Sequence, residues 1–266
     1  KRNRMRNKTK NVLLYEEKNR VAIVTLNRPE QHNALSKSLL NNLDLILEKI
    51  KNDKNIKSVV IFGKGPSFCS GHDLKEMRQT TDKNEHKFLF ELCSRVMTNI
   101  VKLPKPVIAG VQGTATAAGC QLVASCDLAI ASNNSKFATP GVNIGLFCST
   151  PMVAVSRKVS RKKTMKMLLT GDHIKATYAK EIGLINDHYP ISELENEVLK
   201  LAKKIASKSN LTIKIGKKAF YKQLEMPLRK AYQYTSEVMT KNAMEFDAEE
   251  GISAFLEKRK PNWKNK

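Results

Sequence analysis

Residues 107–132, "VIAGVQGTATAAGCQLVASCDLAIAS", contain the pattern from which the fold can be predicted. A run of apolar residues at 107–113 predicts a buried strand, and residues 127–132 predict a second one. The Gly- and Ala-rich residues between them predict a loop that tightens into a helix. A strand, a loop, a helix and another strand form the repeating unit of an α/β domain.

The same alternation continues on the N-terminal side of this segment. Short apolar runs predict strands over 21–27 and 58–63. Ser36 is expected to cap an amphipathic helix over 37–53, and residues 86–103 predict another helix. The order of these elements predicts an α/β fold in which helices cover the sheet.

Three regions follow from the pattern along the chain. The first ten residues include six basic and no acidic side chains, so residues 1–11 are interpreted as a basic arm outside the fold, either disordered or a targeting remnant. Residues 12–191 are predicted to form the core, with an irregular segment over 136–150 and helices from about 151 onward. Residues 192–266 show only helical periodicity, and their apolar stripes predict an oligomer interface.

Composition narrows the classes of partner. With 47 basic and 25 acidic residues the net charge is +22, which suits nucleic acid, anionic lipid or an anionic substrate. The lysines are scattered and not interleaved with aromatic residues, which favours a solvated surface over a nucleic-acid interface. The five cysteines have no metal-like spacing and are expected to be buried free thiols. No run approaches the roughly 18 apolar residues that a membrane span needs.

Two Gly-containing loops, "SGHD" (70–73) and "TAAGCQ" (116–121), each follow a predicted strand and open a helix. Such loops present unpaired N–H groups, and two that converge could hold a carbonyl oxygen. The alternative is that small residues only permit close packing of helix on sheet. The spacing alone favours that alternative, since neither loop matches a phosphate-binding or dinucleotide pattern.

Five segments together resemble the enoyl-CoA hydratase/isomerase (crotonase) superfamily. They are "VAIVTLNRPEQHNALS", "GPSFCSGHDLKEM", "KPVIAGVQGTATAAGCQLVASCDLAIAS", "FATPGVNIGLF" and "LLTGDHIKATYAKEIGLIND". The likeness covers the chain after residue 12 and is greatest to a mitochondrial subgroup of hydratase domain-containing proteins. It implies a crotonase-like spiral of strand–strand–helix turns and a C-terminal helical region that builds trimers or pairs of trimers.

The resemblance also implies binding of acyl-CoA thioesters, with no cofactor beyond the CoA thioester itself. The backbone N–H groups of His72 and Ala118 stand where the family polarises the thioester carbonyl. By position, the residues that would contact the ligand are Arg28, Ala34, Ser70, Gly71, Asp73, Leu74, Gly119 and Lys258.

The chain departs from the family at the two glutamates that hydratases use as acid and base. Gln121 occupies the first of these positions and Gly141 the second. An amide can hydrogen-bond to a water but cannot cycle a proton near neutral pH. Standard hydration is therefore predicted to be weak or lost.

A substitute base could come from the irregular segment, which offers Asn143, Cys148 and Ser149. The side chain of His72 and Asp73 are further candidates, although the position of Asp73 usually serves as a helix cap in the family. Asp127 is interpreted as a structural turn carboxylate. None of these candidates is favoured as a base.

Three functions remain open at this stage. One is an enzyme of acyl-CoA metabolism that uses the two N–H donors with an unidentified base or with the substrate itself. The second is a non-catalytic acyl-CoA binder with a regulatory role in lipid metabolism. The third, RNA binding, is disfavoured because the helix over 37–53 has few lysines. The basic N-terminal residues and the resemblance predict a mitochondrial location, with the cytoplasm as the alternative.

Overall fold

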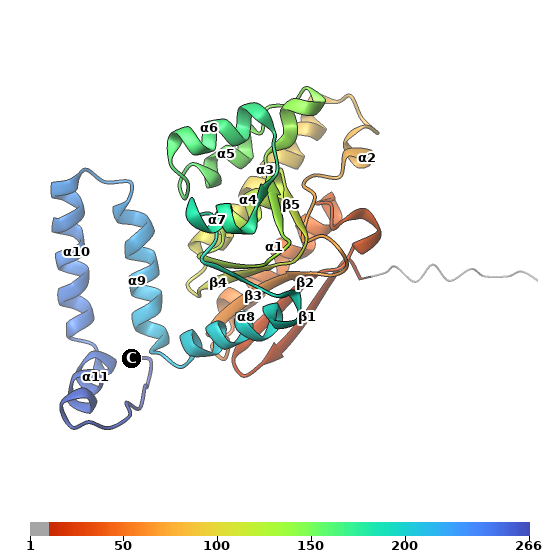
Figure 1. The fold of residues 1–266 in the computed structure, drawn as a ribbon. Helices are drawn as coiled ribbons and strands as arrows, with labels where there is room; N and C mark the ends of the chain where they lie inside the picture. Colours follow the sequence, from red (N-terminus) through yellow and green to blue (C-terminus); the bar gives the residue numbers. More distant parts are fainter. Residues whose placement is uncertain (1–10) are drawn as a thin grey trace, which may run out of the picture.

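The protein is described by a computed structural model that covers residues 11–266. The predicted basic arm, except for its last residue Asn11, therefore lies outside the described residues. The rest of the chain forms a core of two sheets and their covering helices, from which a group of C-terminal helices extends (Figure 1).

The larger sheet has six strands in the order β1-β2-β3-β4-β6-β9. β1 is antiparallel to β2, and the other neighbours are parallel. The strands are β1 (Leu13–Lys18), β2 (Val21–Leu26), β3 (Ser58–Gly63), β4 (Val107–Val111), β6 (Leu128–Ser132) and β9 (Asp187–Tyr189). The predicted strands correspond to β2, β3, β4 and β6.

A smaller sheet stands beside the first, in the order β5-β7-β8. Its strands are β5 (Thr114–Thr116), β7 (Lys136–Ala138) and β8 (Ile174–Lys175). β4 and β5 follow one another directly and lead into α4 (Ala118–Ser125), and β6 and β7 repeat the strand–strand order one turn later. This is the predicted strand–strand–helix spiral.

Helices cover both faces of the larger sheet, because alternate side chains along each strand point to opposite faces. Ala22, Val24, Val59 and Ile61 belong to the main core with α1 (Lys37–Asn52) and α3 (Lys83–Lys102). The intervening residues of the same strands, Val21, Ile23 and Val60, pack with α8 (Ile191–Ala206). The predicted boundary at 191/192 thus falls at the start of a helix that belongs to the core.

Polar groups fix both ends of α1. The Ser36 hydroxyl accepts a hydrogen bond from Leu39 N (3.2 Å), as expected of an N-cap. At the other end the buried Lys105 Nζ donates to the carbonyl oxygens of Ile50 and Asp53. Ile50 O also accepts from the N–H of the C-cap residue Asp53 (3.2 Å). The positive charge of Lys105 beside these carbonyls stabilises the negative end of the helix dipole.

Shorter helices connect the strands. They are η1 (Pro29–Gln31), α2 (Leu74–Met77), η2 (Pro140–Ile144), α5 (Ser149–Val155), α6 (Arg161–Thr170) and α7 (Ala176–Glu181). The segment predicted to be irregular contains β7 and η2, and the region predicted to be helical from 151 contains β8 and β9. Strands of two or three residues have no detectable periodicity and form only because a distant strand pairs with them.

The last three helices extend away from the core and are called the arm. The arm consists of α9 (Asn210–Gln223), α10 (Leu228–Ala243) and α11 (Phe246–Leu256). Figure 1 shows α9 and α10 as an antiparallel pair with α11 at its lower end. The C-terminal residues return to α11, where the buried Asp247 accepts hydrogen bonds from the N–H groups of Lys264 and Asn265.

Candidate functional site

The two Gly-containing loops lie against each other in the structure. Cys69 N donates to Thr114 O (3.1 Å) and Thr116 N donates to Cys69 O (3.0 Å), which joins the first loop to β5. A Cβ placed on Gly71 would lie only 3.3 Å from Ala118 N and 2.8 Å from the Ala117 methyl carbon. The start of α4 is therefore in contact with residue 71.

His72 and Ala118, the two predicted donors, have unpaired backbone N–H groups. Leu35 and His72 form an isolated parallel β-bridge. Its two hydrogen bonds run from Leu35 N to Gly71 O (2.7 Å) and from Asp73 N to Leu35 O (3.3 Å), so the N–H of His72 itself is not used. Ala118 is the first residue of α4, where no helical carbonyl can accept from it. Among residues 11–266, neither N–H has an acceptor.

Close packing fixes the start of α4. A Cβ on Gly119 would lie 2.1 Å from Cys69 O, so only glycine permits this approach of helix to loop. Ala117, just before the helix, has φ +50° and ψ −120°, a conformation that costs a non-glycine residue about 1–3 kcal/mol. Its N–H donates to Ala138 O (2.9 Å), which holds the strained turn in place. The close-packing alternative and the donor interpretation are thus both consistent with this loop.

Two polar side chains near these donors have buried atoms without a partner in the described chain. Gln121 is 4% exposed, and its Oε1 accepts no hydrogen bond. The Nε2 of His72 is also buried without a partner, and its ring packs edge-on against Phe90 at 5.2 Å. Burial lowers the pKa of His72 to about 4, so the ring is neutral at physiological pH.

The second glutamate position is closed by the backbone. A Cβ on Gly141 would lie 2.3 Å from Leu146 O and 2.9 Å from Cys148 Sγ. Leu146 N donates to Gly141 O (2.9 Å), which makes the turn tight. A glutamate cannot occupy position 141 unless this turn opens.

None of the alternative bases in this segment is activated. Cys148 is buried, and burial raises the pKa of its thiol although the N–H of Gly141 points at the sulfur (3.4 Å). A cysteine in this environment is a neutral thiol at pH 7. Asn143 and Ser149 are exposed, and the Ser149 hydroxyl donates only to Phe147 O (3.4 Å).

Arg28 and Asp73 form a structural pair beside the first loop. Arg28 donates to Asp73 Oδ2 (2.8 Å) and to the carbonyl oxygen of the buried Ala34. Asp73 Oδ1 accepts from the N–H groups of Lys75 and Glu76 at the start of α2, which confirms the predicted cap. Burial would raise the pKa of Asp73, but hydrogen bonds from Arg28 and from these N–H groups hold it below its usual value.

The other residues predicted to contact the ligand are only partly brought together. The backbone carbonyl oxygen of Ser70 accepts a hydrogen bond from the Thr116 hydroxyl (3.1 Å). Leu74 is exposed and is the first residue of α2, next to Asp73. Lys258 follows directly after α11 and its C-cap Glu257. Figure 1 shows α11 at the end of the molecule opposite to α2. Within one chain it is therefore remote from both loops.

Asp127 is structural, as predicted, and its partners were not predicted. Its Oδ2 accepts from Val107 N and from Lys217 Nζ, both at 2.7 Å. Its Oδ1 accepts from the Tyr221 hydroxyl at 2.8 Å. Lys217 and Tyr221 lie four residues apart on α9, so their side chains share one face of the helix. This spacing is the one sequence signal that could have indicated a common partner.

Between residues 11 and 266, no group of three or more His, Cys, Asp or Glu side chains could hold a metal ion. No helix in that range is long and apolar enough to cross a membrane.

Comparisons with known proteins point to one family. The family model described as enoyl-CoA hydratase/isomerase matches residues 16–266. The human protein named enoyl-CoA hydratase domain-containing protein 3, mitochondrial, is 49% identical over 90% of this chain and 79% of its own length. A Dictyostelium discoideum protein named probable enoyl-CoA hydratase, mitochondrial, is 34% identical over 94% of this chain and 90% of its own.

Solved structures give the same result. The crystal structure of human enoyl-CoA hydratase domain-containing protein 3 has a TM-score of 0.92 and 46% identity, covering 95% of this chain and 100% of its own. An enoyl-CoA hydratase from Mycobacterium smegmatis has a TM-score of 0.93 and 44% identity, covering 96% and 99%. The predicted fold and the predicted resemblance to the mitochondrial subgroup are confirmed.

Proposed function

The chain belongs to the enoyl-CoA hydratase/isomerase family, and on this basis we propose that it binds acyl-CoA thioesters and acts in acyl-CoA metabolism. The N–H groups of His72 and Ala118 would hold the thioester carbonyl oxygen. The observation that supports this most directly is that both groups are unpaired on two loops in contact. The unpartnered atoms of Gln121 and His72 add support, because buried polar atoms normally acquire a partner.

Standard hydration is not part of the proposal. Two N–H donors stabilise negative charge on the carbonyl oxygen but cannot move a proton to or from the acyl carbons. Gln121 supplies only an amide, and the turn at Gly141 leaves no room for a carboxylate. Any turnover would need a base from outside these two positions.

A second candidate is a non-catalytic acyl-CoA binder with a regulatory role. It is favoured by the chemistry of two of the alternative bases, since His72 is a neutral ring and Cys148 a neutral thiol. Neither is poised for general-base catalysis at pH 7, which needs a pKa near the working pH.

Two measurements on the purified protein separate the candidates. One is the rate of crotonyl-CoA hydration, and the other is the affinity for butyryl-CoA, measured by calorimetry. General acid–base catalysis contributes about 10²–10⁴-fold, so hydration should be at least about a hundredfold slower than in a two-glutamate hydratase. Binding without turnover of any acyl-CoA would support the regulatory role. Hydration at the rate of such a hydratase would contradict both the second candidate and the predicted loss.

Gln121→Glu is the informative variant, because Gly141→Glu would force the turn open. It replaces the amide by one ionisable group of nearly the same shape, and Gln121→Met is the matched variant without one. A rise in hydration in the glutamate variant alone would indicate that the acyl group lies against position 121. No rise, with butyryl-CoA still bound, would argue against that placement.

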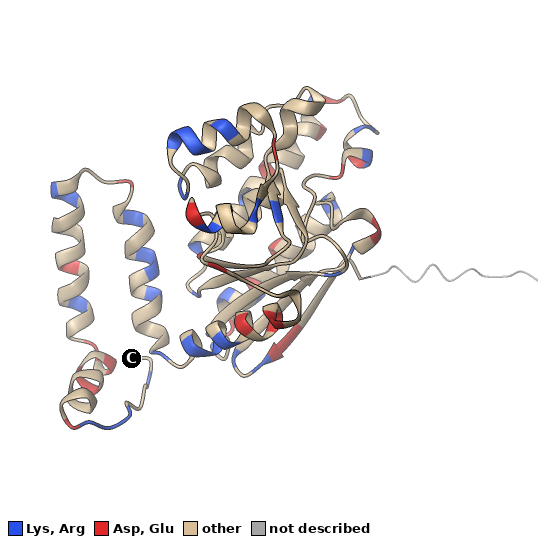
Figure 2. Cartoon of the chain, viewed as in Figure 1, with Lys and Arg blue, Asp and Glu red and all other residues tan. Residues whose placement is uncertain are grey.

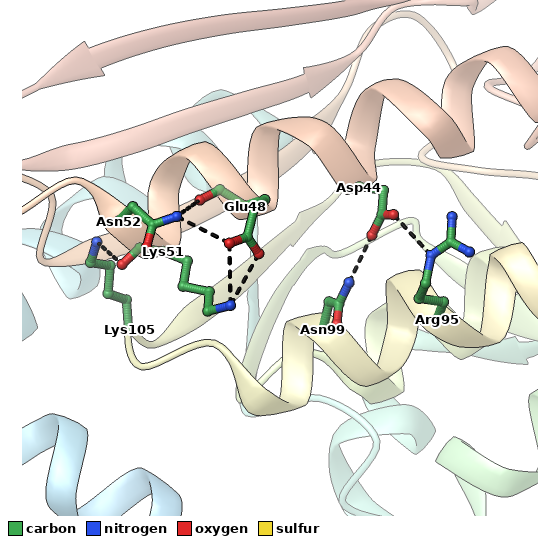
Figure 3. A network of polar contacts seen from close by, with 7 residues as sticks. All are labelled: Asp44, Glu48, Lys51, Asn52, Arg95, Asn99 and Lys105. Atoms are coloured by element: carbon green, nitrogen blue, oxygen red, sulfur yellow. Dashed lines mark hydrogen bonds and ion pairs between the residues drawn. The ribbon is translucent and has the colours of Figure 1, made fainter.

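RNA binding is not proposed. The three lysines of α1 each have a carboxylate partner: Lys37 with Glu85, Lys49 with Glu17 and Lys51 with Glu48. Figure 3 shows the acidic side of this helix, where Asp44 accepts from Arg95 and Asn99 while Glu48 accepts from Lys51. Figure 2 shows basic and acidic residues spread over several elements. A strand of phosphates requires a continuous basic stripe, which α1 does not provide.

We further propose that the protein is a homotrimer or a pair of trimers in the mitochondrion. The exposed apolar side chains of the arm support an interface, and the names of the relatives support the location. The basic net charge suits the phosphates of CoA. Lys258, remote from the loops of its own chain, would reach a ligand only across such an interface.

A further inference from the structure

Helix α6 has an exposed face that combines cations with apolar side chains. The exposed residues between 161 and 169 are Arg161, Lys162, Met165, Lys166 and Leu169. With 3.6 residues per turn, they span an arc of about 140° on one side of the helix. Met165 and Leu169 lie inside this arc, and the cations lie on either side of them. These five residues are called the α6 face.

The cations of the α6 face are not neutralised by the chain itself. Among residues 11–266, no ion pair joins Arg161, Lys162 or Lys166 to a carboxylate, whereas each lysine of α1 has such a partner. The local sequence explains the difference, because residues 128–171 include seven Lys or Arg and no Asp or Glu. Figure 2 shows blue segments and no red segment on α6. The α6 face therefore carries uncompensated positive charge.

Neither component of the α6 face stabilises the isolated chain. The first turn of α6 carries Arg161, Lys162 and Lys163 and no acidic residue, although the positive end of the helix dipole disfavours cations there. Met165 is 50% exposed and Leu169 61%, so much of their apolar surface remains in water. A partner outside the chain would give both components a favourable contact.

The partner has to offer anions and hydrocarbon to the same side of one helix. The surface of an anionic bilayer offers both, with phosphates at the headgroups and acyl chains about 5–10 Å deeper. A nucleic acid offers phosphates, but the α6 face has no aromatic side chain on which a base could stack. A peptide helix docks into a groove, whereas the exposed side of a single helix is convex.

The end of α6 adjoins a further apolar segment. A Cβ on Gly171, the C-cap of α6, would lie 2.9 Å from Asn143 Nδ2, which places this end of the helix against η2. The end of η2 and the residues after it expose Ile144, Leu146 and Phe147, which are 58%, 47% and 44% exposed. Exposed apolar side chains therefore continue from α6 into the neighbouring element.

We propose that the α6 face binds the surface of an anionic lipid bilayer. Met165 and Leu169 enter the boundary between headgroups and acyl chains, and Arg161, Lys162 and Lys166 contact the lipid phosphates. The helix lies on the bilayer and does not cross it. This inference goes beyond the proposed function, because binding to a bilayer requires neither acyl-CoA nor turnover.

The test is flotation of the purified protein with vesicles of phosphatidylcholine alone or of phosphatidylcholine and phosphatidylglycerol in equal amounts. The wild type should bind only the anionic vesicles, and added salt should weaken the binding. Lys162→Gln combined with Lys166→Gln should weaken it about thirtyfold, since each cation near an anionic surface contributes about a factor of five. Met165→Gln combined with Leu169→Gln should weaken it about tenfold with no change in net charge.

The control is Lys200→Gln combined with Lys204→Gln, which should bind as the wild type does. It removes the same charge at the same spacing from exposed positions of α8, a helix on the other face of the larger sheet. The basic residues at 1–10 are present in every variant, so a difference between variants reports on α6. Amide hydrogen exchange of the wild type on anionic vesicles should slow in α6 and not in α8.

Three results would overturn the proposal. They are no binding of the wild type to anionic vesicles, an equal loss of binding in the α8 control, and wild-type binding in the Met165 and Leu169 variant. The last of these would indicate a purely electrostatic surface, such as one for an acidic polypeptide. Butyryl-CoA affinity is measured in parallel and should be unchanged in all variants. Loss of vesicle binding with intact butyryl-CoA binding would therefore leave the proposed function standing.

Discussion

Gly119 is the residue on which the spacing of the two loops depends. A methyl group at this position would lie 2.1 Å from the backbone oxygen and 2.7 Å from the carbonyl carbon of Cys69. Because backbone cannot rotate away as a side chain can, Gly119→Ala should separate the start of α4 from the loop at 69–73. The distance between the N–H groups of His72 and Ala118 would then increase.

We therefore expect Gly119→Ala to lower the free energy of unfolding by about 1–3 kcal/mol and to weaken butyryl-CoA binding at least about tenfold. Urea denaturation and calorimetry measure the two effects. Gly216→Ala is the matched control, because a Cβ there meets nothing within 4 Å on α9. It should be neutral or slightly stabilising.

His72 should make stability depend on pH. Its pKa is near 6.5 when unfolded and about 4 in the folded protein, so between these values the unfolded chain binds a proton that the folded chain does not. The free energy of unfolding should fall as the pH drops from 6.5 to 4, by up to about 3 kcal/mol from this residue. His72→Phe, which keeps a ring against Phe90, should remove that part of the decline in urea denaturation curves. Identical pH profiles for both proteins would contradict it.

At the scale of elements, the long segments were predictable and the short ones were not. The strands at β2, β3, β4 and β6 and the capped helix α1 follow from apolar runs and periodicity. β1 was missed because charged residues fill its exposed positions as an edge strand. β5, β7, β8 and β9 have only two or three residues each, and their partners are distant in sequence.

The candidate site was predictable only in part, for a related reason. The resemblance pointed to the N–H groups of His72 and Ala118, whereas their spacing in the chain did not. The closed turn at Gly141 depends on the carbonyl of Leu146, a backbone contact that no residue pattern reveals. The pairing of Asp127 with Lys217 joins residues 90 apart in sequence and needed the fold.

The Ser36 cap gives a prediction for one element. Ser36→Ala leaves Leu39 N without its acceptor at the start of α1, which should cost about 1 kcal/mol and lower the melting temperature by about 2–4 °C. Ser38→Ala, at an exposed position of the same helix, is the control. Equal melting temperatures in the two variants would show that the cap contributes nothing.

At the scale of the whole molecule, the arm buries little of its own apolar surface. Its buried residues in α9, α10 and α11 are Ala219, Ala231, Asp247 and Ala254, none of them large and apolar. Uncovered apolar surface of this extent is typical of an interface. Light scattering should therefore give three or six times the chain mass of 29.9 kDa. A stable monomer at micromolar concentration would contradict the predicted assembly.

The central claim is that two backbone N–H groups hold a thioester carbonyl. It is tested most directly by comparing the affinity of the protein for butyryl-CoA with that for its thioether analogue, which has the same chain and CoA but no carbonyl oxygen. Two hydrogen bonds contribute about 1–3 kcal/mol, so the thioester should bind at least about tenfold more tightly. Equal affinities for the two ligands would contradict the claim.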